Sequence, residues 1–157
     1  ICEYAQEKLK NHKETAITSL DEDSEHKLED FDEVLLGASV RYGFHRKNVY
    51  EFVRENKDEL LKKKTAFFSL NLTARKPEKA SPETNPYIVK FLKKVDWEPD
   101  LKSVFAGRLD YPSLNCPNRL AILLIMAITN GPKDLSRVHD FTNWSKVDEM
   151  VESIRNL

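Results

Sequence analysis

The most constraining feature of the sequence is a short, continuously apolar segment followed by small residues. Residues 34–36 read VLL without alternation of polarity, and residues 37–39 read GAS. A strand with one face in water alternates polar and apolar residues, whereas a strand of a parallel sheet is buried on both faces and is apolar throughout. The segment therefore predicts a strand inside a parallel sheet, which needs helical crossover connections and helices on both faces.

Helix-like and strand-like patterns alternate along the rest of the chain. Apolar residues recur at helical spacing in 1–11, 46–62, 86–95 and 144–157, and strand-like runs occupy 15–20, 66–72, 103–106 and 138–141. Asn85 and Pro86 fit the N-cap and N1 positions of the third helix. The alternation predicts one doubly wound α/β domain over 1–157, with helices on both faces of the sheet.

A basic segment interrupts this pattern at about 73–100. Its first part, 73–86, contains three prolines and no helical period, so we expect a loop there. Residues 41–108 hold 16 Lys and Arg against 9 Asp and Glu, which would attract an anionic ligand. The alternative is that residues 62–64 only end a helix favourably and the other cations are solvated surface.

Several common kinds of site are excluded by the residues present. The four glycines cannot form GxGxxG or the P-loop motif, and no GxSxG nucleophile motif occurs. The four histidines and two cysteines make no zinc pattern, so we expect no metal. Cys2 and Cys116 are not spaced as a disulfide framework, which favours a reducing cytosol.

Candidate site residues follow two of the predicted buried strands, in 37–46 (GASVRYGFHR) and 69–77 (SLNLTARKP). Ligands of open parallel sheets bind at the carboxyl ends of the strands. Small residues admit a flat ligand, Arg41 and Arg75 carry charge, and Tyr42 offers a ring face for stacking. The alternative is that the glycines only shape turns and the aromatic rings belong to the core.

The chain resembles the flavodoxin-like menaquinone-dependent protoporphyrinogen oxidases in four strings. They are FDEVLLGASVRYG (31–43), SLNLTARKPEK (69–79), AGRLDYP (106–112) and TNW (142–144). The resemblance implies a flavodoxin-like sheet of order 2-1-3-4-5, an FMN cofactor and an oxidoreductase of haem synthesis. Such an enzyme oxidises protoporphyrinogen IX to protoporphyrin IX and passes the electrons to a membrane quinone, menaquinone. The resemblance implies no nucleic-acid partner.

The resemblance also assigns site residues by position. One loop would flank the FMN ring, through Ser39, Val40, Arg41, Tyr42, Gly43 and His45. The other would line its pyrimidine edge, through Asn71, Leu72, Thr73, Ala74 and Arg75. Cations for the two substrate propionates would be Arg75, Lys76, Lys79, Lys90 and Lys94, and the sequence favours Arg75 over the lysines, which are more often plain surface. The flavin performs the redox chemistry, so no catalytic side chain is assigned, and His45 is expected to have a structural role.

The chain departs from the family at its front end. The family opens with a strand and a Ser/Thr-rich loop around the FMN phosphate, whereas Ile1 already lies in the first predicted helix. Loss of that central strand would leave a gap of roughly 10 Å between the strands that should pair with it. We therefore expect that the chain is a truncated form of a longer protein, and that a real truncation would weaken FMN binding.

Residues 120–129 form a ten-residue apolar run, too short for a membrane span. We expect a buried core helix, and the alternative is a helix that touches a membrane surface with Arg119 and Lys133 beside it. That alternative would place the protein peripherally on the cytoplasmic face of the inner membrane. Two other functions stay open, namely a flavodoxin-like electron carrier or quinone reductase, and a cofactor-free interaction module.

Overall fold

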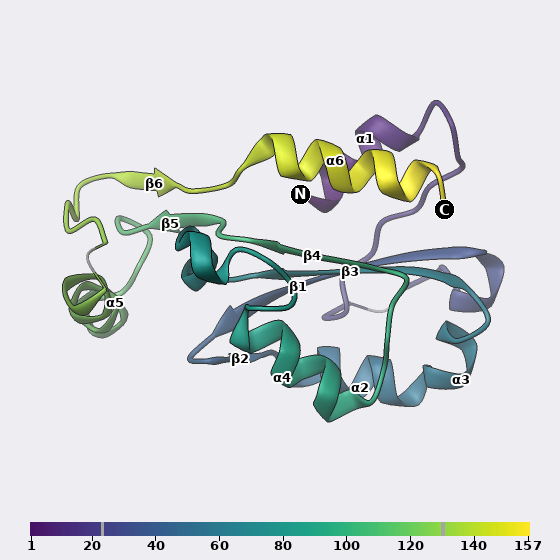
Figure 1. Ribbon diagram of the computed structural model, residues 1–157, viewed down its shortest axis with the longest axis horizontal. Helices are drawn as coiled ribbons and strands as arrows, with labels where there is room; N and C mark the ends of the chain where they lie inside the picture. The colour runs from purple at the N-terminus through teal and green to yellow at the C-terminus, as the bar shows by residue number, and fades with distance from the viewer. Residues whose placement is uncertain (23, 130) are drawn as a thin grey trace.

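The computed structural model describes residues 1–157 except positions 23 and 130. Its main sheet contains β1 (Glu33–Arg41), β2 (Phe44–His45), β3 (Lys64–Leu70) and β4 (Leu101–Phe105), in the order β2-β1-β3-β4 (Figure 1). β1, β3 and β4 run parallel, with Leu36 opposite Phe67 and Phe68 opposite Ser103. β2 returns antiparallel against the end of β1. The predicted parallel α/β fold is confirmed.

Helices cover both faces of this sheet (Figure 1). On one face lie α1 (Cys2–Leu9) and α6 (Trp144–Arg155), and on the other lie α2 (Lys47–Glu55), α3 (Lys57–Leu60) and α4 (Pro86–Val95). Each face has its own core. Phe67 points into the core under α2 and α4, while its neighbour Phe68 points into the core under α1 and α6. A strand with alternate side chains in two apolar cores must be apolar throughout, as its sequence predicts.

Helix boundaries follow local chemistry. The Asn85 side chain accepts a hydrogen bond from the Tyr87 amide at 3.1 Å, so the predicted N-cap of α4 is confirmed. The predicted helix 46–62 is interrupted instead. The Asn56 side chain donates to the Phe52 carbonyl at 2.9 Å, and the chain leaves helical geometry there, which separates α2 from α3.

A smaller unit lies beyond one end of the main sheet (Figure 1). It contains β5 (Arg108–Asp110), α5 (Cys116–Ile128) and β6 (Val138–Asp140). β5 and β6 pair antiparallel in a sheet of their own. The predicted last strand, 138–141, was therefore correctly placed along the chain but wrongly assigned to the parallel sheet.

The expectation that residues 120–129 form a buried core helix is wrong. Met126 is the buried residue of α5 among those described, whereas Leu120, Leu124 and Ile128 are exposed. The helix packs on a small cluster with Leu109 and Tyr111 rather than between a sheet and a second layer, so no described element covers its other side. Across the described residues, no helix is both long and apolar enough to cross a membrane.

The predicted strand at 15–20 is also wrong. Residues 15–19 have no regular secondary structure, Leu20 lies in a turn, and none of them pairs with a strand among the described residues. The Gln6 side chain donates to the Thr15 carbonyl at 3.4 Å. Three short 3₁₀ helices complete the described structure, at Leu28–Asp30, Leu72–Arg75 and Pro77–Lys79. The last two lie in the predicted loop 73–86, except that the first of them begins one residue earlier, at Leu72.

Candidate functional site

The turn between β1 and β2 places an aromatic ring in solvent at the carboxyl end of β1. Tyr42 has a φ of 52° and Gly43 a φ of 83°, the positive values that suit a two-residue hairpin turn. This backbone conformation raises the free energy of a tyrosine by roughly 1 kcal/mol, whereas glycine adopts it without that cost. Tyr42 is nevertheless 82% exposed, and its hydroxyl donates to Asn118 Oδ1 at 2.9 Å. The backbone is therefore strained while the ring stays available to a ligand.

A second ring and a cation lie directly after this turn. Phe44 is about half exposed, and the Lys90 ammonium lies 4.6 Å from the centre of its ring. Arg41 is exposed on the last residue of β1. The hairpin thus combines ring faces with positive charge, which suits a flat anionic ligand.

His45, predicted beside the cofactor, lies beneath the surface instead. Its Nε2 is 2.9 Å from Ser69 Oγ, and its ring packs between Phe67 and Phe91, with the centres 5.8 and 4.8 Å away. Burial lowers the pKa of His45 from 6.5 to about 4, so the imidazole is neutral near pH 7. The side chain anchors the hairpin to β3 and does not present its ring to the surface.

The loop after β3 is held by buried amides. Asn71 donates from Nδ2 to Ser69 Oγ at 3.1 Å and accepts at Oδ1 from Asn85 Nδ2 at 3.1 Å. Asn85 also donates to the Lys79 carbonyl at 2.9 Å. Ser69, Asn71 and Asn85 are all buried, so their polar atoms need these partners. The network joins the ends of β3 and the start of α4, and through Ser69 it reaches His45.

Arg75 connects the same loop to α5. Its guanidinium donates to the Leu72 carbonyl at 2.9 Å and to the Thr129 carbonyl at 3.0 Å. A cation beside the last carbonyls of a helix is favourable because the helix dipole is negative there. Tyr42 contacts Asn118 in the first turns of α5, so each predicted site loop is hydrogen-bonded to a different end of this helix.

The predicted substrate cations do not all lie together. Lys90 contacts Phe44 at the hairpin, whereas Lys94 lies one turn further along α4, with its ammonium 4.9 Å from the centre of the Tyr50 ring. Lys76 and Lys79 are partly buried on the loop that leads to α4. The structure thus places Lys90 over the exposed Phe44 ring and Lys94 over the buried Tyr50 ring.

α5 is the neighbour of the site that the sequence reasoning missed. Its exposed apolar residues repeat at intervals of four, through Leu120, Leu124 and Ile128, and Ile125 is also about half exposed. The exposed side could not have been found in the sequence, because residues 120–128 are apolar at every position and so on every side of the helix. No local pattern indicates either that this helix lies next to the loops after β1 and β3.

The residues present fit a flat flavin ring better than a metal ion. Within the described ranges, no group of three or more His, Cys, Asp or Glu could hold a metal. The exposed Tyr42 ring beside a polar loop offers stacking on one side and hydrogen bonding on the other. Both lie at the carboxyl ends of adjacent parallel strands, where such folds bind nucleotides.

Comparison with known proteins identifies the class to which this fold belongs. A family described as a flavodoxin domain matches residues 1–136. The protoporphyrinogen IX dehydrogenase [quinone] of Escherichia coli strain K12 is 40% identical over 133 residues, which cover 85% of this chain and 74% of that protein. The enzyme of the same name from Leishmania major is 40% identical over 131 residues, or 83% of this chain and 57% of that protein. No solved structure matches the chain.

These matches identify both the fold of the chain and one enzyme family that has this fold. The flavodoxin match covers both site loops, and the curated relatives exceed the identity at which family membership is secure. The chain belongs to the flavodoxin-fold family of protoporphyrinogen IX dehydrogenases.

Proposed function

We propose that the protein oxidises protoporphyrinogen IX to protoporphyrin IX in haem synthesis, with FMN as cofactor and a quinone as electron acceptor. The observation that carries the proposal is the exposed Tyr42 turn, which lies between a cationic helix and an apolar helix. The names of the relatives from E. coli and L. major support the same reaction. A plain electron carrier has no need of an apolar helix beside the site.

FMN, when bound, supplies the two-electron redox chemistry. The Tyr42 ring would stack on one face of the flavin, with Ser39, Val40, Arg41 and Gly43 shaping that side. The polar edge of the ring would meet Asn71, Leu72, Thr73, Ala74 and Arg75. His45 holds the hairpin in place from below and stays neutral, so it neither adds charge at the flavin nor exchanges a proton there near pH 7.

The substrate is an apolar macrocycle with two propionates, and the surface around Tyr42 offers both chemistries. The Phe44 ring with the Lys90 ammonium above it forms an apolar face next to a cation. Lys90 is therefore our first choice for a propionate contact, followed by Arg75, Lys76 and Lys79 on the loop after β3. Lys94 is the weakest candidate because its ammonium lies over Tyr50.

The exposed stripe of α5 would receive the apolar acceptor. A quinone with a long isoprenoid tail, such as menaquinone, resides in a bilayer, so an enzyme that reduces it must meet the membrane surface. Leu120, Leu124 and Ile128 give α5 an apolar side for such peripheral contact with the cytoplasmic face of the inner membrane. Arg119 is not available to headgroups because its guanidinium donates to the Tyr111 and Pro112 carbonyls. Lys133 remains as a flanking cation.

The test is anaerobic turnover of protoporphyrinogen IX with FMN and a water-dispersed menaquinone analogue, followed by porphyrin fluorescence. We expect porphyrin to form and Lys90→Gln to raise KM for the porphyrinogen about tenfold, the effect of losing one charge-assisted contact. Lys62→Gln, an exposed lysine far from the hairpin, is the control and should leave KM unchanged. Quinone reduction without porphyrin fluorescence would instead identify an electron carrier or quinone reductase.

Membrane contact is tested separately by sedimentation with anionic phospholipid vesicles. Leu124→Glu places a charge in the middle of the exposed stripe and should reduce the bound fraction severalfold. Val89→Glu, at a similarly exposed apolar position on α4, is the matched control. Equal binding of both variants would remove α5 from the proposed contact.

A further inference from the structure

Ile125 is an exposed apolar residue of α5 that does not belong to the stripe of Leu120, Leu124 and Ile128. The residue is 49% exposed. Successive residues of a helix turn by about 100°, so Ile125 lies on a side of α5 that is turned away from Leu120 and Leu124. Positions 118, 125 and 129 share this side, because residues separated by four or seven positions lie on one face of a helix. A membrane in contact with the stripe would therefore leave Ile125 uncovered.

This side of α5 is attached to both candidate site loops. Near the start of the helix, Asn118 Oδ1 accepts from the Tyr42 hydroxyl at 2.9 Å. At its end, the Thr129 carbonyl accepts from the Arg75 guanidinium at 3.0 Å. The two attachments are about 16 Å apart along the helix axis, and Ile125 lies between them. Its side chain therefore projects in the same direction as the two contacts, toward the space beside the site loops.

Both ends of α5 are held, so the direction of Ile125 is fixed as well. The Arg119 guanidinium donates to the Tyr111 carbonyl at 3.1 Å in front of the helix. Behind the helix, the Gly131 amide donates to the Met126 carbonyl at 2.7 Å, and a Cβ added to Gly131 would lie 2.3 Å from Met126 Sδ. A rotation of α5 that turned Ile125 away from the loops would break these contacts.

The side of α5 between the attachments has an apolar middle and polar ends. Ala121, one turn before Ile125, is also exposed. The ends carry the Asn118 amide and the Arg75 guanidinium. The porphyrinogen has the same pattern, because its macrocycle is apolar and its propionates lie at the rim. A quinone has the reverse pattern, with carbonyl oxygens on its ring and an apolar tail, and would need donors in the middle of the wall.

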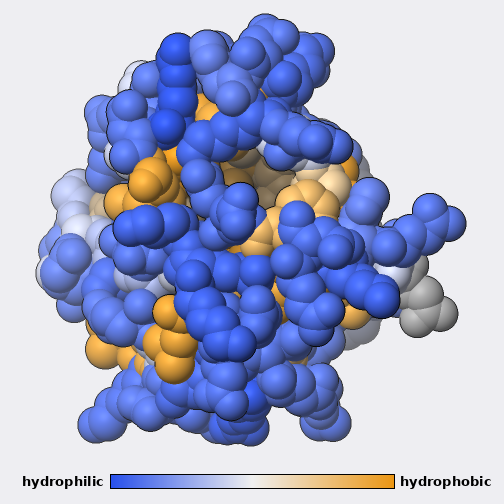
Figure 2. Space-filling model, turned by 90° about the vertical axis from the view of Figure 1, so that its right-hand side faces the viewer, coloured by the Kyte–Doolittle hydropathy of each residue, from blue (hydrophilic) through white to orange (hydrophobic). Residues whose placement is uncertain are grey.

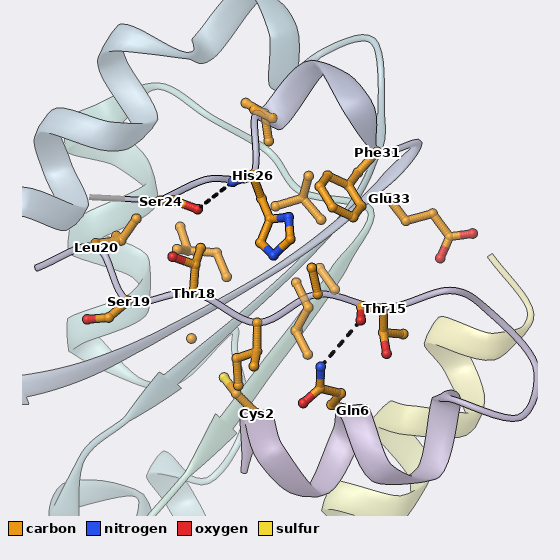
Figure 3. A pocket seen from close by; sticks show the side chains of 18 of the residues that line it. Cys2, Gln6, Thr15, Thr18, Ser19, Leu20, Ser24, His26, Phe31 and Glu33 are labelled. Atoms are coloured by element: carbon orange, nitrogen blue, oxygen red, sulfur yellow. Dashed lines mark hydrogen bonds between the residues drawn. The ribbon is translucent and has the colours of Figure 1, made fainter. Parts of the chain in front are cut away.

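A second apolar space lies near the site, beside the outer edge of β1. It has a volume of about 1230 Å³. Figure 2 shows this hollow on the face away from α5, and Figure 3 shows side chains of α1 and of residues 15–33 around it. The flavodoxin-like strand order places a strand at this edge of the sheet. That position belongs to the sheet, so the macrocycle is assigned to the wall on α5.

We propose that Ile125, with Ala121 beside it, forms a wall of the substrate site, and that the macrocycle of protoporphyrinogen IX lies against α5 between the contacts with Tyr42 and Arg75. Ile125 is then a specificity-determining residue, because its branched side chain limits the size of the ring that this space admits. The inference rests on the proposed function and names a substrate contact of the same site.

The binding test compares Ile125→Cys with Ala127→Cys in the 157-residue chain at saturating FMN. Ala127 is exposed on the opposite side of α5 and is the matched control. Saturating protoporphyrin IX, the flat product, should slow alkylation by iodoacetamide at least fivefold at Ile125→Cys and leave the rate at Ala127→Cys unchanged. Mass spectrometry of tryptic peptides separates these thiols from Cys116 and from Cys2, which lines the cavity beside β1.

The turnover test uses a larger side chain at the same two positions. Ile125→Trp fills the space beside the loops and should raise KM for protoporphyrinogen IX at least tenfold. KM for the menaquinone analogue and the affinity for FMN should stay within twofold. Ala127→Trp should leave all three quantities unchanged. A general loss of stability would not change one KM and spare the other.

Three results would overturn the proposal. Unchanged alkylation at Ile125→Cys in the presence of porphyrin, together with normal turnover, would keep the reaction and remove the wall. Protection of Cys2 alone would place the macrocycle in the cavity beside β1. Protection of Ile125→Cys by the menaquinone analogue but not by porphyrin would assign the wall to the electron acceptor. Protection by porphyrin without any turnover would instead support the wall and contradict the proposed reaction.

Discussion

The two loops at the carboxyl ends of β1 and β3 differ in what they present and in how they are held. The loop after β1 exposes the rings of Tyr42 and Phe44 and has one buried anchor, His45. The loop after β3 has its key side chains turned inward, with Asn71 buried and Arg75 hydrogen-bonded to α5. A flat ligand placed between them would meet exposed ring faces on one side and a loop held by buried hydrogen bonds on the other.

The loops nevertheless share one anchor. Ser69 Oγ lies 2.9 Å from His45 Nε2 and accepts from Asn71 Nδ2 at 3.1 Å. Because both bonds meet at a fully buried hydroxyl, the relative position of the loops is set inside the protein and not at its surface. Variants of this network should therefore separate the stability of the loops from their ligand chemistry.

The largest expected effect belongs to Asn85→Ala. The change removes the α4 cap and leaves the buried Asn71 amide without its partner, so the free energy of unfolding should fall by about 3 to 4 kcal/mol. The measurement is urea unfolding at pH 7.5. Asn143→Ala, which removes the exposed cap of α6, is the control and should cost about 1 kcal/mol. Equal losses would show that the buried amide pair adds nothing.

The role of His45 as the anchor of the loop after β1 should be visible in the pH dependence of the protein's stability. The unfolded His45 takes up a proton near pH 6.5, whereas the folded one does so only near pH 4, so stability should decline as pH falls between these values. The loss specific to His45 reaches up to about 3 kcal/mol. We expect His45→Gln, which keeps a hydrogen-bonding group and does not titrate, to lose correspondingly less between pH 7.5 and 4. Parallel curves for both proteins would contradict this role.

Much of the fold could be predicted because its cause is local. The continuous apolar runs of β1 and β3 report burial on both faces, and the Asn85–Pro86 pair marks a helix start by its own chemistry. The predicted strand at 15–20 failed because a strand exists only with a partner, which no local pattern supplies. The helix at 120–129 was found, but its exposure depends on which layer covers it, and that is decided by distant residues.

The candidate site, like the fold, has one part that could be predicted from the sequence and another that could not. The rule that ligands meet the carboxyl ends of parallel strands located both loops from the sequence. The attachment of α5 could not be predicted, because the Tyr42–Asn118 and Arg75–Thr129 contacts join residues 76 and 54 positions apart. His45 was assigned by position to the cofactor loop and was also expected to have a structural role, and alternation along β2 turns its side chain inward, as a structural role requires.

Arg75→Met tests how far the β3 loop depends on α5. Methionine keeps an unbranched side chain with an apolar stem but cannot donate to the Leu72 and Thr129 carbonyls. The free energy of unfolding, measured with urea, should therefore fall by about 1 to 2 kcal/mol. Arg137→Met, which breaks an exposed ion pair with Asp134, should change it by less than about 0.5 kcal/mol. If Arg75 also contacts a propionate, KM for protoporphyrinogen IX should rise while kcat changes little. A loss of stability without any change in KM would assign Arg75 to the attachment of α5 alone.

The smallest effect on stability, and the one that best separates the loops, is expected for Tyr42→Asn. Asparagine tolerates the positive φ better than tyrosine, so relief of strain should exceed the loss of the exposed bond to Asn118 and raise stability by about 0.5 kcal/mol. FMN affinity, measured by quenching of flavin fluorescence, should fall about tenfold because the stacking ring is gone. Tyr42→Phe keeps the ring and the strain but loses the hydroxyl, so it should bind FMN within about twofold of the original protein and be slightly less stable. Opposite changes in stability and affinity would show that the turn is held in a costly conformation for the sake of the ring, whereas a Tyr42→Asn protein that binds FMN normally would place the flavin elsewhere.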